Sequence, residues 1–261
     1  MRAHDISFTV AFGCISRTLI VRDRIFGWVG TGATETPGLS LEKLKIPSGE
    51  NLLDAVFLTP TPRPARAAVL LCHGIGETIQ HWFPVQRLLA ENGVASLIFD
   101  YSGYGRSTGK PHWEQFEQDA ISAFAQLERM APQIPVALLG FSLGSGVAAA
   151  TVHRVRAERL ILCQAFTSFR SAAAACGIPR ALDRFVPPIW NANTSLANCK
   201  LPVLIVHGEK DRLFPVEMAH ELAGCCAAGA EVVLVPNTSH NQPFRKPRMD
   251  YWGMISDWIA R

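Results

Sequence analysis

The sequence lacks a strong charge imbalance, and this excludes one class of partner. Over 261 residues, 25 Lys and Arg residues stand against 22 Asp and Glu residues, which gives a net charge of +3. The basic residues are scattered along the chain, whereas nucleic-acid-binding proteins gather them into a patch or stripe. The charge pattern therefore predicts a small-molecule substrate and no nucleic-acid partner.

The sequence also lacks an N-terminal hydrophobic run long enough to cross a membrane. The segment "ISFTVAFGCIS", residues 6–16, is too short for that purpose. Asp5 precedes it and no small-x-small cleavage site follows, so a signal peptide is not indicated. We expect residues 1–38 to form a packed or loosely docked N-terminal extension. The alternative is a peripheral anchor that gives weak membrane association.

Cysteine motifs are a third absence. Cys225 and Cys226 are adjacent, without the C-x-x-C spacing or the nearby histidine pair that redox and zinc sites need. Cys72, Cys163 and Cys199 lie in or beside apolar runs, where a thiol usually packs as a small hydrophobe. We therefore expect reduced cysteines, no metal and a cytoplasmic location.

What the chain does contain is a regular alternation of apolar, strand-length runs with helix-length segments. This alternation predicts the α/β class, with a mostly parallel eight-stranded sheet covered by helices on both faces. The expected strands are 41–47, 52–58, 67–72, 94–99, 136–140, 159–164, 203–207 and 231–235. The expected helices are 79–91, 113–130, 144–155, 215–227 and 247–260.

Two segments depart from the alternation. The first two strands carry charged residues and are joined by the turn-like "IPSGEN", so they should form an antiparallel edge. Residues 165–202 separate two core strands by more than a typical crossover needs. We expect a small cap there, inserted into one domain that covers residues 39–261.

A serine framed by glycines carries the chemical signal. "GFSLG", residues 140–144, follows an apolar strand directly and opens an Ala-rich helical segment. In such a nucleophile elbow Ser142 sits on a strained turn, and Gly140 and Gly144 let strand and helix approach closely. The alternative is an ordinary glycine-rich turn with a capping serine.

A nucleophilic serine needs a histidine base and a carboxylate that orients it, in the chain order Ser, Asp or Glu, His. Asp211 lies in the loop after the strand 203–207, and His240 in the loop after the strand 231–235. Glu209 is the rival acid, and His220 is the rival base within an expected helix. The loop after strand 159–164 begins "QAFTSF" and offers no carboxylate.

An oxyanion needs two further hydrogen-bond donors. One should be the backbone N–H of Leu143, directly after the serine. The other should come from "CHGIGE", residues 72–77, and we assign it to Ile75. Six aromatic residues are candidates for an apolar acyl pocket, with core packing as the alternative for each. They are Trp82, Phe83, Trp113, Phe166, Phe169 and Trp190.

With "HGIGE", "FDYSGYGRSTG", "GFSLGSG", "VHGEKDRLFP" and "SHN" in this order, the sequence resembles the α/β-hydrolase superfamily from about residue 39 onward. It is most similar to the branch of Bem46-like proteins and serine aminopeptidase or monoglyceride-lipase-like hydrolases. The resemblance implies an α/β-hydrolase fold, the triad Ser142, Asp211 and His240, an oxyanion hole at Ile75 and Leu143, and no cofactor.

These features predict a serine esterase that cleaves carboxylic esters of short to medium acyl chains through an acyl-enzyme. An acyl thioesterase or a peptidase would use the same triad. A non-catalytic scaffold on the same fold is the alternative from a different class.

Overall fold

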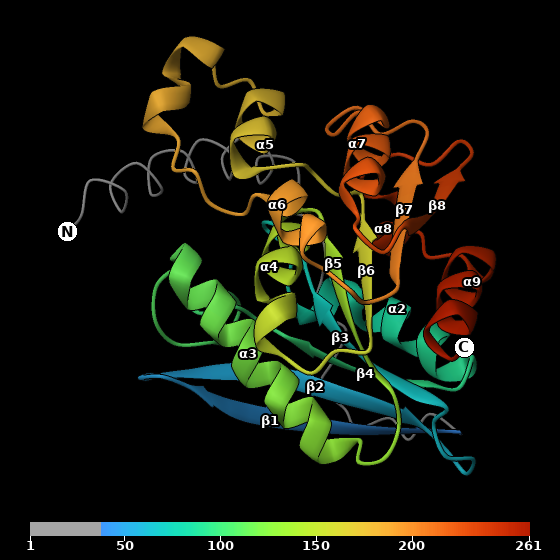
Figure 1. Ribbon diagram of the computed structural model, residues 1–261. Helices are drawn as coiled ribbons and strands as arrows, with labels where there is room; N and C mark the ends of the chain where they lie inside the picture. Colours follow the sequence, from blue (N-terminus) through green and yellow to red (C-terminus); the bar gives the residue numbers. More distant parts are fainter. Residues whose placement is uncertain (1–37) are drawn as a thin grey trace.

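A computed structural model describes residues 38–261 (Figure 1). Its centre is one eight-stranded sheet in the order β1-β2-β4-β3-β5-β6-β7-β8. The strands are β1 (Leu39–Ser48), β2 (Asn51–Pro60), β3 (Ala67–Cys72), β4 (Val94–Phe99), β5 (Val136–Phe141), β6 (Arg159–Cys163), β7 (Val203–Gly208) and β8 (Ala230–Val235). The sheet confirms the predicted fold class.

The first two strands form the predicted antiparallel edge. β1 pairs with β2, and Lys45 Nζ lies 3.1 Å from the Asp54 carboxylate across this pair. β2 then pairs antiparallel with β4. From β4 to β8 every neighbouring pair is parallel. The carboxyl ends of six strands therefore meet at one edge of the sheet.

Helices cover both faces of this sheet (Figure 1). α2 (Ile79–Glu91), α8 (Gln242–Arg245) and α9 (Met249–Ile259) pack on one face, around the buried Trp82 and Trp252. The other face carries α3 (Trp113–Met130), α4 (Leu143–Thr151) and α7 (Glu217–Cys225). Predicted helices 79–91 and 113–130 coincide with α2 and α3.

Some boundaries differ from the prediction. The helix expected over 144–155 ends at Thr151 and continues as the 3-10 turn η1 (Val152–Arg154). The strand expected over 159–164 ends at Cys163, because Gln164 has a φ of 49° that extended backbone cannot adopt. The short helix α8 was not predicted, since its four residues include Pro243 and show no helical periodicity.

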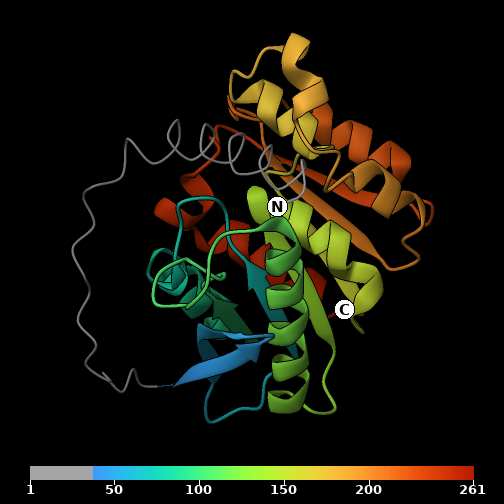
Figure 2. The ribbon, with the colours of Figure 1, turned by 90° about the vertical axis from the view of Figure 1, so that its left-hand side faces the viewer.

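Between β6 and β7 the chain leaves the sheet and forms three short helical segments; the first two project above the sheet, and the third packs against α4 and α7 (Figure 2). They are α5 (Phe169–Ala175), η2 (Arg180–Phe185) and α6 (Ala192–Ala197). Gly177 with a φ of 92° ends the first, and Pro187 and Pro188 follow the second. The glycine and the prolines divide the segment into short helical pieces, although it is long enough for a single helix.

The predicted N-terminal extension, residues 1–38, lies almost wholly outside the described residues. Its expected weak membrane association and the cytoplasmic location stay predictions. Among residues 38–261, no helix combines the length and the apolar character that crossing a membrane requires. Cys72, Cys163 and Cys199 are free and at most 1% exposed, and burial raises the pKa of the Cys72 and Cys163 thiols to about 12.

Candidate active site

The fold brings the predicted triad residues into one hydrogen-bonded chain. Ser142 follows β5, Asp211 lies in the loop after β7, and His240 lies in the loop after β8. His240 Nε2 is 2.9 Å from Ser142 Oγ, and His240 Nδ1 is 2.7 Å from Asp211 Oδ2. The predicted partners are therefore in contact, although 98 residues separate Ser142 from His240.

Ser142 occupies a strained turn between β5 and α4. Its φ of 52° and ψ of −117° lie outside the regions that non-glycine residues normally adopt. Its N–H donates to the Cys163 carbonyl at 3.0 Å, and its own carbonyl accepts from Ser145 N–H at 2.9 Å. A Cβ on Gly140 would lie 2.6 Å from Ser145 Cα, so strand and helix are closer than any side chain allows.

Asp211 is held from two sides. Its Oδ1 accepts the N–H groups of Leu213 and Phe214 at 2.8 and 2.9 Å, which leaves Oδ2 for His240. Because a carboxylate only accepts hydrogen bonds, Nδ1 of His240 carries the proton and Nε2 is free to accept from the serine. The rivals take no part in this chain of contacts: Asp211 and His240 make the bonds, and Glu209 and His220 are both exposed.

His207, on β7, contacts the loop that carries Asp211. Its Nε2 donates to the Phe214 carbonyl at 2.9 Å and lies 3.5 Å from Asp211 Oδ2. Burial lowers the pKa of His207, partly opposed by that hydrogen bond. A neutral imidazole here braces the loop without competing with His240 for the negative charge of Asp211.

The two residues assigned to the oxyanion hole lie on neighbouring segments. Ile75 is in the loop between β3 and α2, and Leu143 is the first residue of α4. Gly144 brings the segments together, because a Cβ there would lie 2.8 Å from the His73 carbonyl oxygen. Both residues are buried, with 9% and 5% of their surface exposed.

A carboxylate that the sequence analysis left without a role braces this loop. Glu77 is buried, and its Oε2 accepts the Gly74 N–H at 2.8 Å and the Trp82 indole N–H at 2.7 Å. Its place in "CHGIGE", a loop after a core strand, is the signal that could have identified it. Glu77 therefore fixes the first turn of the loop that carries Ile75.

A second buried polar pair flanks the same loop. His73 directly follows β3 and Asp100 directly follows β4, with His73 Nε2 3.9 Å from Asp100 Oδ1. Burial lowers the pKa of His73 to about 4 and raises that of Asp100 to about 6. The Asp100 carboxyl also accepts the N–H of Ile79, the first residue of α2.

Of the six candidate pocket aromatics, four are buried in the hydrophobic core and two, Phe83 and Trp113, are partly exposed. Trp82 belongs to the core, since it packs against Phe244 and Trp252 with ring centroids 5.7 and 5.8 Å apart. Phe166 is nearer to the site. Its ring meets Phe214 at 5.5 Å, and Phe214 meets the His240 ring at 5.1 Å.

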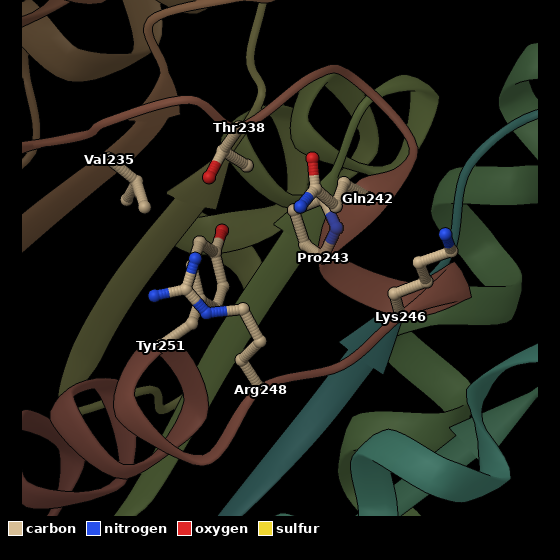
Figure 3. Close-up of a pocket in the computed structure, with 7 residues that line it drawn as sticks. All are labelled: Val235, Thr238, Gln242, Pro243, Lys246, Arg248 and Tyr251. Carbon is tan, nitrogen blue, oxygen red and sulfur yellow. The ribbon is translucent and has the colours of Figure 1, made fainter.

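A small pocket lies between the loop after β8, α8 and the start of α9 (Figure 3). Thr238, Arg248 and Tyr251 line it together with four neighbours, and none of the triad residues does. The Arg248 guanidinium is paired with the Asp250 carboxylate. Within residues 38–261, no three His, Cys, Asp or Glu side chains are grouped to hold a metal ion.

Comparison with known proteins identifies the family of the chain. The family model of serine aminopeptidase, S33, matches residues 63–192. The chain is 30% identical over 199 residues to the uncharacterized protein YfhR of Salmonella typhi, covering 70% of this chain and 67% of YfhR. It is 27% identical over 223 residues to the protein Bem46 of Schizosaccharomyces pombe, covering 80% and 72% of the two chains. This chain belongs to the Bem46-like branch of the α/β-hydrolase superfamily.

Two further comparisons set the extent of this relationship. The chain is 29% identical to an uncharacterized protein of Mycobacterium tuberculosis, covering 67% of this chain but only 63% of that protein's length. An esterase from Pyrococcus furiosus has the same fold, with a TM-score of 0.72 at 18% identity, covering 90% of this chain and 97% of the esterase. That structural likeness establishes the fold.

Proposed function

We propose that this hydrolase cleaves carboxylic esters of short to medium acyl chains with Ser142, His240 and Asp211 as a catalytic triad. The observation that carries the proposal is the continuous hydrogen-bonded chain from Ser142 Oγ through His240 to Asp211. A serine hydroxyl becomes a nucleophile when a base takes its proton, and a carboxylate fixes the tautomer of that base. The contacts supply both requirements.

The reaction proceeds in two halves. Ser142 Oγ attacks the ester carbonyl carbon while its proton passes to His240 Nε2, and Asp211 stabilises the imidazolium. The N–H groups of Ile75 and Leu143 hold the oxyanion. His240 then protonates the leaving alcohol, which leaves an acyl group on Ser142. A water molecule, deprotonated by His240, attacks this acyl-enzyme and releases the acid.

The aromatic packing next to the elbow supports a limited acyl chain length. A Cβ on Gly146 in α4 would lie 2.6 Å from Phe166 Cζ and 3.1 Å from Trp190 Cβ, so these side chains fill the space beside α4. Phe214 continues this packing up to the His240 ring. Because these buried side chains fill the space beside α4, we expect a short acyl chain to fit better than a long one.

Hydrolysis of p-nitrophenyl esters from acetate to palmitate tests the proposal. We expect turnover that falls with acyl chain length and that drops on the order of a million-fold in Ser142→Ala. A Ser142→Ala protein with undiminished turnover would overturn the triad. A folded wild-type protein that turns over no ester would redirect the search to thioesters and amides, and then to the scaffold function.

A peptidase is the second candidate, because the matching family model is named for a serine aminopeptidase. The same triad attacks amides, with His240 protonating the leaving amine. Hydrolysis of aminoacyl p-nitroanilides, compared with the esters at equal enzyme concentration, separates the two. A kcat/KM that is higher for the anilides would favour the peptidase.

A further inference from the structure

The residue that follows β6, Gln164, is buried among the loops that carry the acid and the base. None of its surface is exposed, and its φ of 49° lies in the left-handed region that non-glycine residues rarely adopt. Its N–H donates to the Val206 carbonyl of β7 at 3.0 Å. Backbone strain of this kind persists only where surrounding contacts hold it.

Those contacts are made by the side-chain amide, which bridges two loops. Oε1 accepts the N–H of Gly208, the last residue of β7, at 2.7 Å. Nε2 donates to the carbonyls of Ser239 and His240 at 3.2 and 3.4 Å. A primary amide can serve both ends, because one end accepts and the other donates.

The Gly208 end of the bridge leads directly to the acid. The Asp211 N–H donates back to the Gly208 carbonyl at 3.0 Å, so Gly208 begins the turn that presents Asp211. A Cβ on Gly208 would lie 2.9 Å from Gln164 Nε2 and 2.9 Å from the Thr238 carbonyl carbon. The loop that carries Asp211, the loop that carries His240 and the Gln164 side chain are therefore tightly packed against one another.

The other end of the bridge reaches the backbone of the base itself. Elsewhere the two loops are joined through Lys210 N–H, which donates to the Thr238 carbonyl at 3.0 Å, two residues before the histidine. Gln164 instead donates to the carbonyl of His240. The Gln164 amide thus connects Gly208, where the turn to Asp211 begins, with the backbone of His240.

We propose that Gln164 is a positioning residue that sets the distance between Asp211 and His240, and through it the alignment of His240 with Ser142. The inference rests on the proposed function for its effect on rate, whereas its effect on the Asp211–His240 hydrogen bond is independent of any substrate. Misplacement of a catalytic group by 1 Å costs about a hundredfold in rate.

Gln86 offers a matched control. It is fully buried, and its Nε2 donates to the carbonyls of Val56 and Ser96 at 3.2 and 3.1 Å, on α2 and away from the triad. Replacing either glutamine by methionine keeps the side-chain length and removes the hydrogen bonds. Replacing either by glutamate keeps an acceptor oxygen, and the buried carboxyl must take up a proton before it can donate to the carbonyl oxygens.

The experiment compares Gln164→Met and Gln164→Glu with Gln86→Met and Gln86→Glu. For the Gln164 pair we expect kcat and the rate of Ser142 labelling by a fluorophosphonate to fall roughly ten- to a hundredfold, with little change in KM. The Gln86 pair should lose stability in urea and keep the wild-type kcat per folded molecule. Wild-type kcat in Gln164→Met would overturn the inference, because that variant lacks both the bond to Gly208 and the bond to His240.

Proton NMR supplies the readout that does not depend on activity. The His240 Nδ1 proton, hydrogen-bonded to Asp211, should give a downfield resonance that is weakened or lost in Gln164→Met and unchanged in Gln86→Met. An unlabelled, inactive wild-type protein would refute the proposed function alone. An unchanged resonance in Gln164→Met would refute the positioning role even if the wild-type enzyme is active.

Discussion

The buried pair of Asp100 and His73 makes a prediction about stability and pH that can be worked out quantitatively. The pKa of Asp100 is raised from 3.8 to about 6 by burial, so the folded state binds more protons than the unfolded state between these values. Stability contributed by this group is therefore lost as pH rises through that window. Raising the pKa from 3.8 to about 6 corresponds to roughly 3 kcal/mol over the whole pH window.

His73 acts in the opposite direction. Its pKa is lowered from 6.5 to about 4 by burial, so the unfolded state binds more protons in this range and stability rises with pH. Between about pH 4 and pH 6 the pair carries one proton in both states, on Asp100 when folded and on His73 when unfolded. The two contributions cancel, and the wild-type protein should show little pH dependence from this pair.

Asp100→Asn removes the titrating carboxyl of the pair, so the pH dependence contributed by His73 is no longer cancelled. The amide oxygen can still accept the Ile79 N–H, which Asp100 Oδ1 accepts at 2.9 Å. The free energy of unfolding of the variant, minus that of the wild type, should rise by about 2 kcal/mol between pH 4 and pH 6.5 and then level off. Urea unfolding followed by tryptophan fluorescence at several pH values measures this difference. A difference that is constant, or that falls with pH, would refute the reasoning.

Three further predictions, one of them with a control variant, test the packing and the site. Gly208→Ala places a Cβ 2.9 Å from the carbonyl carbon of Thr238, in the loop that carries His240, and should lower the free energy of unfolding in urea by about 1–3 kcal/mol. The control Gly224→Ala, in α7, meets nothing within 4 Å and should raise that free energy by roughly 0.5–1 kcal/mol. Equal effects of the two substitutions would contradict this prediction. Asp211→Asn should keep its backbone bonds, turn its NH₂ toward His240 and lower kcat about ten-thousand-fold in ester assays; a wild-type kcat would count against the triad. Glu77→Leu should lower kcat by roughly tenfold with KM unchanged, less than the hundredfold or more for a lost oxyanion donor, and an undiminished kcat would exclude its bracing role.

The order of the elements could be predicted because each core strand is a nearly continuous apolar run. β3, β4, β5 and β7 are buried along their whole length, and such strands stand out from the amphipathic helices between them. α2 and α3 were predicted with their bounds because their apolar residues keep helical spacing. The cap was predicted only as an insertion, since its short segments follow local turns at glycine and proline.

The contacts of the triad could be anticipated from chain order, because the carboxyl ends of parallel strands share one edge. Gln164 could not be anticipated in the same way. Its sequence position marks it as the end of a strand, whereas its left-handed φ and its bridge to Gly208 and His240 depend on two loops far along the chain. Glu77 is an intermediate example. The motif "CHGIGE" indicates that it is near the site, whereas its hydrogen bond from Trp82 is seen only in the folded structure.

The most direct test of the central claim is covalent labelling of the folded protein with a fluorophosphonate, followed by intact-mass measurement and peptide mapping. The geometry of Ser142, His240 and Asp211 predicts one adduct per chain, on the peptide that contains Ser142, and none in Ser142→Ala. An adduct that persists in Ser142→Ala, or no adduct on a folded wild-type protein, would contradict the assignment of Ser142 as the nucleophile.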